Sequence, residues 1–192
     1  ASPLETQFGG EVKGFEPTDF ISKKDVRRMD RFAQLAVAAA RQAVEAARFD
    51  TETRGEETGV IIGAGIGGLT TMFEQAKIFL EKGPNRITPF LIPMMISDMG
   101  AAQVSIALGL KGPNFCTTSA CSSGSDAIGV AFESIQQGRA DAMLAGGTEC
   151  GMNPLAFAAF NALNALSTAN DDPHHASRPF DADRTGFVMS EG

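Results

Sequence analysis

The stretch Cys116-Thr-Thr-Ser-Ala-Cys121-Ser-Ser-Gly124-Ser-Asp-Ala-Ile-Gly129 places a cysteine at the junction of two kinds of local structure. Residues 114–119 favour a strand, and residues 122–137 favour a helix of small side chains. The N–H groups and the positive dipole end at the start of a helix favour a thiolate and can face an oxyanion. Cys121 is therefore a candidate nucleophile, and this stretch alone leaves a buried structural cysteine open as the alternative.

Outward from this corner, predicted strands alternate with predicted helices. Hydrophobic patterning predicts strands at 58–63 and 142–145 and the start of another at 187–189. Helices are expected at 22–47, 69–82, 97–108, 122–137 and 153–165, with irregular chain at 1–20, 87–93 and 167–184. The alternation predicts an α/β fold with a largely parallel central sheet, in one domain or part of one.

The composition of the 192 residues, 43% hydrophobic and 20% charged, is typical of a soluble globular protein. A formal net charge of −7 argues against a general nucleic-acid binder, which carries a basic face. Three cysteines provide no disulfide framework and favour a reducing compartment. No apolar run reaches membrane-spanning length and no secretory signal heads the chain, so neither nucleic acid nor membrane is an expected partner.

The run Gly63-Ala-Gly-Ile-Gly-Gly68 matches the G-x-G-x-x-G pattern of dinucleotide-binding turns, between a predicted strand and a predicted helix. Such a site also needs a following strand that ends in Asp or Glu about 20 residues further on. Residues 81–89 contain no such strand. We therefore expect no cofactor, but a turn whose glycines allow close backbone approach to a neighbouring segment.

The two histidines of the chain, His174 and His175, are adjacent in a polar loop. Neutral imidazole is a good zinc ligand and general base, but no second ligand pair with metal-site spacing accompanies them. We interpret them as surface residues and expect no metal. Cys116, inside a predicted strand, and Cys150, after a glycine turn, are interpreted as structural.

A basic cluster lies at the start of the first predicted helix, in an otherwise acidic chain. Ser22 stands three residues before Asp25, a spacing typical of a helix N-terminus. A solvated helix face and a docking patch for an acidic partner are both open interpretations of the cluster. Its members are Lys23, Lys24, Arg27 and Arg28.

Further segments follow the order and spacing of one enzyme family. They are Gly63–Gly68, Gly112-Pro113, Ala145-Gly-Gly-Thr-Glu149, Ala165-Leu-Ser167, Ala176-Ser-Arg-Pro-Phe-Asp181 and Arg184-x-Gly-Phe-Val-x-x-Glu-Gly192. Together with Cys121 they resemble the type II, or elongating, β-ketoacyl-acyl-carrier-protein synthases over essentially the whole chain. The resemblance implies the thiolase fold, with two similar α/β/α/β/α halves in one subunit, and usually a homodimer.

The resemblance also implies a reaction. Cys121 takes an acyl group from acyl-carrier protein as a thioester. Decarboxylation of malonyl-carrier protein then yields a carbanion that attacks the thioester and lengthens the chain by two carbons, in fatty-acid or polyketide synthesis. A thiolate at a helix start suits this acyl transfer.

Other positions take their roles from the resemblance alone. Asn164 departs from the family pattern, since many relatives have an arginine there in the carrier-docking region. The matched positions are Ile66, which limits acyl-chain length near the dimer interface, Phe160 and Phe187, which lie near the reactive cysteine, and Lys24, Arg27 and Arg28, which contact the carrier protein.

Members of this family are about twice as long as this chain, in keeping with two halves of ordinary domain size. We therefore expect residues 1–192 to form part of the N-terminal domain. The first strand would be absent, as would the C-terminal half with its two active-site histidines, its lysine and its gating loop. The expected location is the cytoplasm, or a plastid in a plant or alga.

Two related functions stay open at this point. One is a thiolase acting on acyl-CoA, which also uses a cysteine nucleophile. The other is a non-catalytic chain-length partner subunit, which lacks the nucleophile. The segment Ser177-Arg-Pro-Phe-Asp181 favours a synthase over a thiolase, and Cys121 argues against the partner subunit.

Overall fold

The computed structural model describes residues 4–192. The chain divides into two compact units. Residues 15–150 with Gly192 form the larger unit, and residues 4–14 with 151–191 form the smaller one. Among the described residues, no helix combines the length and apolar character needed to cross a membrane.

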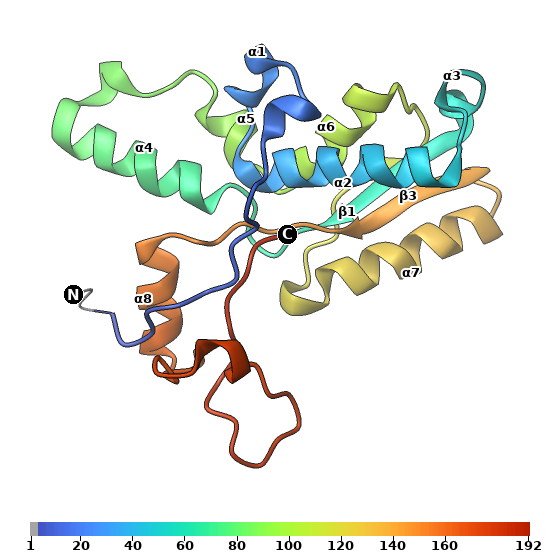
Figure 1. The fold of residues 1–192 in the computed structure, drawn as a ribbon. Helices are drawn as coiled ribbons and strands as arrows, with labels where there is room; N and C mark the ends of the chain where they lie inside the picture. Colours follow the sequence, from blue (N-terminus) through green and yellow to red (C-terminus); the bar gives the residue numbers. More distant parts are fainter. Residues whose placement is uncertain (1–3) are drawn as a thin grey trace. The chain divides into compact units, whose positions relative to one another are not determined.

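The larger unit is built on a parallel sheet in the order β2-β1-β3, of which Figure 1 labels β1 and β3. β1 (Thr58–Gly63) is central and buried along its whole length, with β2 (Asn114–Phe115) and β3 (Ala142–Gly147) on either side. Each pair of neighbouring strands is joined through helices, as parallel strands require. The predicted α/β fold with a parallel sheet is confirmed.

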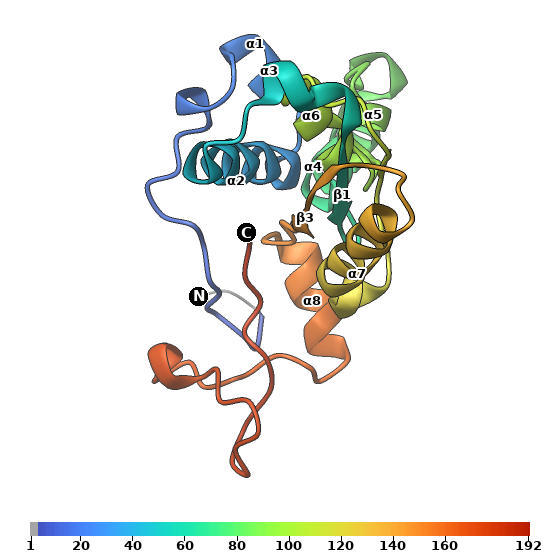
Figure 2. The same cartoon turned by 90° about the vertical axis from the view of Figure 1, so that its right-hand side faces the viewer.

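Helices cover both faces of this sheet (Figure 2). α2 (Arg31–Ala47) packs on α6 (Met99–Leu108) over one face, and α7 (Ser123–Gln136) covers the other. Small side chains on the inner face of α7 allow it to lie close to β1. The main core between α2, β1 and α6 includes Phe32, Val37, Val60 and Val104, each at most 1% exposed.

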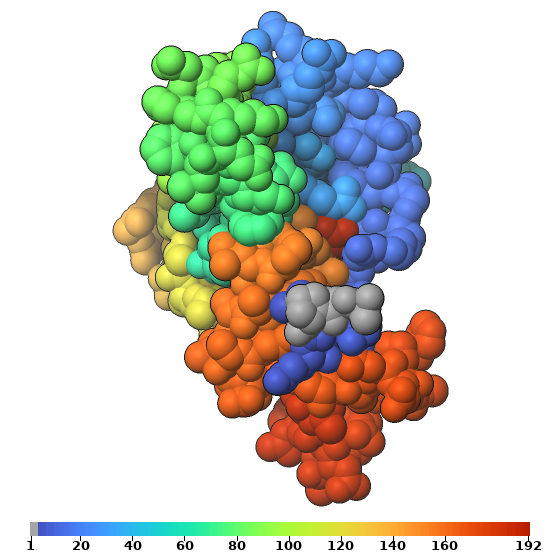
Figure 3. All heavy atoms as spheres, turned by 90° about the vertical axis from the view of Figure 1, so that its left-hand side faces the viewer, coloured from blue at the N-terminus to red at the C-terminus, as the bar shows by residue number. Residues whose placement is uncertain are grey.

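Shorter elements complete the larger unit. Figure 3 shows the α4–α5 segment, in green, beside the blue segment that contains α1. The remaining helices are α1 (Lys23–Val26), α3 (Thr51–Arg54), α4 (Leu69–Lys82) and α5 (Leu91–Met95). The 3-10 turns are η1 (Pro17–Asp19), η2 (Gly55–Glu57), η3 (Pro84–Arg86) and η4 (Ala120–Ser122).

The prediction of one continuous helix at 22–47 is wrong, because the structure has two helices there. The side chain of Ser22 caps α1 as expected, but α1 ends at Val26 and α2 begins at Arg31. Asp30 causes the break, because its buried carboxylate accepts a hydrogen bond from Phe32 N at 3.3 Å and caps a new helix.

The region 87–93, predicted to be irregular, contains the start of α5 at Leu91. Pro93 does not prevent this, because it lies in the first turn, where backbone N–H groups have no hydrogen-bond acceptor within the helix. The helix predicted at 69–82 is confirmed to the residue and ends at Gly83, with a φ of +82°.

The smaller unit contains α8 (Pro154–Ala162), the turn η5 (Pro173–His175) and long loops. The strand predicted at 187–189 is wrong, since Phe187 forms one isolated bridge with Leu166 and Ser190 forms one with Gly10. Gly186 has a φ of +141°, which breaks the extended backbone directly before Phe187 and limits the pairing.

Candidate active site

Cys121 is exposed and lies in η4, directly before the 14-residue helix α7, at the carboxyl edge of the sheet. The strand predicted at 114–119 is shorter than expected and ends at Phe115. Beyond Phe115, Thr117 O accepts a hydrogen bond from Ala64 N at 3.1 Å, and the side chains of Thr117 and Ser119 bond to the start of α7. The helix predicted from 122 is confirmed, and Cys121 stands at its N-terminal end.

Ser123 holds this corner together although its role is not evident from the sequence. Its buried hydroxyl donates to Ala120 O at 2.6 Å and accepts from Ser119 N at 3.0 Å. The hydroxyl of Thr117 donates to Ser123 O at 2.8 Å. Ala120 has a φ of +52°, a left-handed conformation that costs a non-glycine residue roughly 1–2 kcal/mol. These bonds compensate the strain and fix the backbone around Cys121.

Glycines bring the ends of β1 and β3 against the start of α7. A Cβ at Gly63 would lie 2.1 Å from Ser123 O, and a Cβ at Gly147 would lie 3.0 Å from Gly124 Cα. Only glycine permits such backbone approach. The corner that carries the candidate nucleophile Cys121 therefore rests directly on the sheet.

An open hollow of about 440 Å³ lies beside the corner. Asp126 accepts a hydrogen bond from the Ser119 hydroxyl there. The hollow is lined by Thr117, Thr118, Ser119, Ser125, Asp126, Gly129, Val130 and Glu133.

The glycine-rich loop 63–68 joins β1 to α4 and carries Ile66, which is 50% exposed. A Cβ at Gly68 would lie 2.1 Å from Met94 O, so the loop backbone contacts the end of α5. The expected close backbone approach is confirmed. Glu149, two residues after β3, accepts hydrogen bonds from Ile66 N at 2.9 Å and Gly67 N at 3.2 Å. Its carboxylate thus takes the N–H groups that a phosphate would need.

The basic cluster lies on α1 and directly after it, where Lys24, Arg27 and Arg28 are all exposed. The guanidinium of Arg28 stacks over the Phe90 ring, 4.8 Å from its centroid, which ties the cluster to the start of α5. Asn164, which departs from the family pattern, is exposed in the smaller unit with a φ of +52°.

Phe160 and Phe187 contact each other within the smaller unit. Their rings meet edge to face with centroids 5.2 Å apart. Phe187 is fixed by its backbone, since its N–H donates to Ala165 O and its carbonyl accepts from Ser167 N, both at 2.9 Å. The family resemblance implied that each of these rings lies near Cys121, and that placement stays a prediction. Cys121 belongs to the larger unit.

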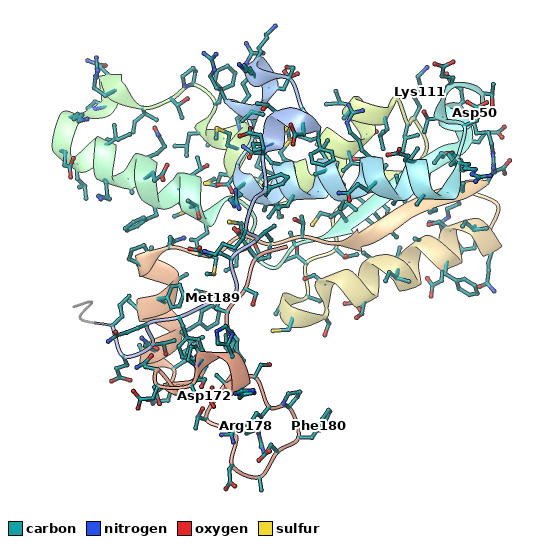
Figure 4. All side chains as sticks on the ribbon, in the orientation of Figure 1. Asp50, Lys111, Asp172, Arg178, Phe180 and Met189 are labelled. Atoms are coloured by element: carbon teal, nitrogen blue, oxygen red, sulfur yellow. The ribbon has the colours of Figure 1, made fainter. Side chains whose placement is uncertain are left out.

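The histidine loop is a surface feature, as predicted. His175 Nδ1 lies 2.8 Å from Asp172 Oδ1, and both side chains are exposed. The same loop contains Arg178, whose guanidinium donates to Asp183 O at 2.8 Å, and Phe180, which is fully exposed (Figure 4).

Comparison with known proteins identifies the family. The model of the beta-ketoacyl synthase N-terminal domain matches residues 2–192. This chain belongs to that family. A 3-oxoacyl-[acyl-carrier-protein] synthase 2 from Synechocystis sp. is 53% identical over 100% of this chain and 46% of its own length. The chain thus spans about half the length of the curated relatives it matches.

Solved structures of β-ketoacyl synthases share this fold. One from Burkholderia phymatum is 37% identical, with a TM-score of 0.87 over 100% of this chain and 47% of that chain. Another, described as a type II PKS acyl-carrier protein in complex with its ketosynthase, is 22% identical and shows the fold alone. It has a TM-score of 0.76 over 82% of this chain and 46% of that chain.

Proposed function

We propose that this chain is the acyl-accepting part of a 3-oxoacyl-acyl-carrier-protein synthase that extends acyl chains by two carbons. The observation that carries the proposal is the exposed Cys121 at the start of α7, in a chain whose full length matches the family. Relatives about 50% identical bear that enzyme's name. Residues 1–192 would then form most of its N-terminal domain.

The geometry suits the first half-reaction. The Cys121 thiolate attacks the thioester carbonyl of an acyl-carrier protein, a new C–S bond forms, and the carrier's thiolate leaves as the old bond breaks. The positive end of the α7 dipole favours both the thiolate and the oxyanion of the intermediate. Residues outside this chain would perform the decarboxylation of the second substrate.

Acyl-carrier protein is the partner we propose for the basic cluster, through Lys24, Arg27 and Arg28. These cations are exposed in a chain of net charge −7. Their local positive charge would attract an acidic protein. Relatives about 50% identical are named 3-oxoacyl-[acyl-carrier-protein] synthase 2, and that name supports the same partner. A homodimer and a cytoplasmic or plastid location stay predictions from the family resemblance.

We also propose that Ile66, Phe160 and Phe187 bind the acyl substrate, as the family resemblance implies. Ile66 is exposed beside the nucleophile corner, where an apolar side chain could contact an acyl group. The edge-to-face pair of Phe160 and Phe187 provides an apolar wall in the smaller unit. We expect shortening of Ile66 to admit longer acyl chains.

The test is acylation of Cys121 in the intact protein, followed by mass spectrometry of the peptide that contains it. Acyl-carrier protein should leave one acyl group on Cys121, and Cys121→Ala should abolish both acylation and chain extension. Cys121→Ser, a weaker nucleophile, should lose chain extension as well. Equal acylation by acyl-CoA alone would favour a thiolase, and undiminished extension by the alanine variant would refute the proposal.

The docking proposal uses the same assay. Lys24→Glu should raise KM for acyl-carrier protein roughly 5-fold at low salt, and less at high salt because exposed charges are screened. Lys82→Glu, an equal charge change at the end of α4, is the matched control. Equal effects of the two variants would contradict a specific docking patch.

A further inference from the structure

Glu149 takes no part in the acyl transfer proposed above, yet its carboxylate binds the loop beside the nucleophile. Oε2 accepts from Ile66 N at 2.9 Å and Oε1 accepts from Gly67 N at 3.2 Å. Two successive N–H groups around one carboxylate form a charge-assisted anion nest. Gly67 has a φ of +85°, a left-handed conformation that favours glycine.

The position of Glu149 is set by the sheet. It lies two residues after the end of β3, and Thr148 N donates to Gly63 O at 2.9 Å, which continues the contact between β1 and β3. The backbone of Glu149 also exchanges two hydrogen bonds with Gly192, of 2.9 Å and 3.1 Å. The carboxylate is therefore presented to the loop from a fixed backbone.

The opposite side of the loop is closed by the end of α5. A Cβ at Gly67 would lie 2.8 Å from Ser97 Cα, and a Cβ at Gly68 would lie 2.1 Å from Met94 O. The loop is thus clamped between this segment and Glu149, while Ile66 between them keeps half of its surface exposed.

The same loop borders the nucleophile corner. A Cβ at Gly65 would lie 3.1 Å from Glu149 Oε2 and 3.6 Å from Ala120 O, the carbonyl that directly precedes Cys121. A shift of the loop would therefore change the space next to the reactive sulfur.

We propose that Glu149 is a positioning residue for acyl-chain selection. Its carboxylate fixes the backbone of Ile66, and Ile66 in turn limits the acyl chain bound at Cys121. The inference rests on the proposed function, because it assigns the support of that same site. Without the carboxylate, the N–H groups of the loop turn to water and Ile66 no longer holds one position.

The experiment measures kcat/KM for acyl-carrier protein that carries either a long or a short acyl chain, in the intact wild type and in Glu149→Ala. We expect the ratio of long to short to rise at least about 10-fold, the discrimination that one methylene group gives in an apolar pocket. Glu149→Gln keeps one acceptor oxygen and should show an intermediate ratio. Glu81→Ala, which removes an exposed carboxylate from α4, is the matched control and should not change the ratio.

A double variant separates positioning from a general structural effect. Because Glu149 acts through Ile66, adding Glu149→Ala to Ile66→Ala should change the ratio less than about 3-fold. The inference would be overturned if Glu149→Ala lowers kcat/KM equally for both chain lengths. It would also be overturned if Glu149→Ala and Ile66→Ala change the ratio additively. If Glu149→Ala fails to fold, the test falls to Glu149→Gln. A folded Glu149→Gln protein with the wild-type ratio of kcat/KM for long over short chains would then overturn the inference.

The two proposals fail in different ways. A wild type that forms no acyl thioester on Cys121 refutes the proposed function. A wild type that is acylated, with a length preference unchanged by loss of the Glu149 carboxylate, refutes only the positioning role.

Discussion

Replacement of Gly63 by alanine tests whether β1 positions Cys121, the proposed nucleophile. The new Cβ would lie 2.1 Å from Ser123 O and 2.2 Å from its carbonyl carbon. Carbon–oxygen contacts are ordinarily at least about 3.3 Å, so the start of α7 must retreat by roughly 1 Å. Both partners are buried backbone, and no flexible side chain can absorb the displacement.

Two magnitudes follow from this overlap. Overpacking of this kind costs about 1–3 kcal/mol, which lowers Tm by roughly 2–12 °C for a chain of this length. Displacement of a reacting group by about 1 Å can cost about 100-fold in rate. We therefore expect Gly63→Ala to slow acylation of Cys121 far more than its loss of stability would explain.

The assay is the initial rate of acyl transfer to Cys121, with thermal unfolding measured on the same samples. Gly146→Ala is the matched control, because a Cβ at this strand glycine would meet nothing within 4 Å. The control should keep both the rate and Tm close to wild type. A Gly63→Ala protein that acylates at the wild-type rate would refute the idea that β1 sets the position of the nucleophile.

Two further predictions concern stability. Asp30→Ala removes the buried cap of α2 and the acceptor for Thr71 N at 2.9 Å, and should cost about 3 kcal/mol in urea unfolding. Asp50→Ala, which removes the exposed cap of α3, should cost clearly less, and equal losses would contradict the role of burial. The pKa of Glu57 is raised above 4.5 by its hydrogen bond to Asp141 and by the charge of that carboxylate. The folded state therefore holds the proton to higher pH than the unfolded chain, and stability falls as pH rises through the range just above 4.5. Glu57→Gln should flatten this part of the plot of Tm against pH, and an unchanged slope would contradict the assignment.

Several elements of the fold could be predicted from local patterns. The strand at 58–63 is a continuous apolar run between polar turns, and the helix at 69–82 ends at Gly83-Pro84, which cannot continue it. Both were confirmed with their predicted bounds. The α/β arrangement followed from the alternation of such elements, since parallel strands need helical crossovers.

The errors arose where a distant contact overrides the local pattern. The apolar spacing of 22–47 predicts one helix, but the carboxylate of Asp30 binds Phe32 N and also Thr71 N of α4. The three residues at 187–189 have strand propensity, but among them Phe187 alone forms a bridge, an isolated one with Leu166. Propensity describes a segment alone, and these outcomes depend on its neighbours.

By itself, the sequence determined the candidate nucleophile Cys121, the parallel α/β plan and the family motifs, because each of these is encoded in short runs of residues. Only the tertiary structure decided what holds the site. Ser123 meets the backbone of Gly63, and Glu149 binds a loop 83 residues earlier in the chain. Such contacts follow from the packing of α7 and the glycine-rich loop against the strand ends, and no local spacing encodes them.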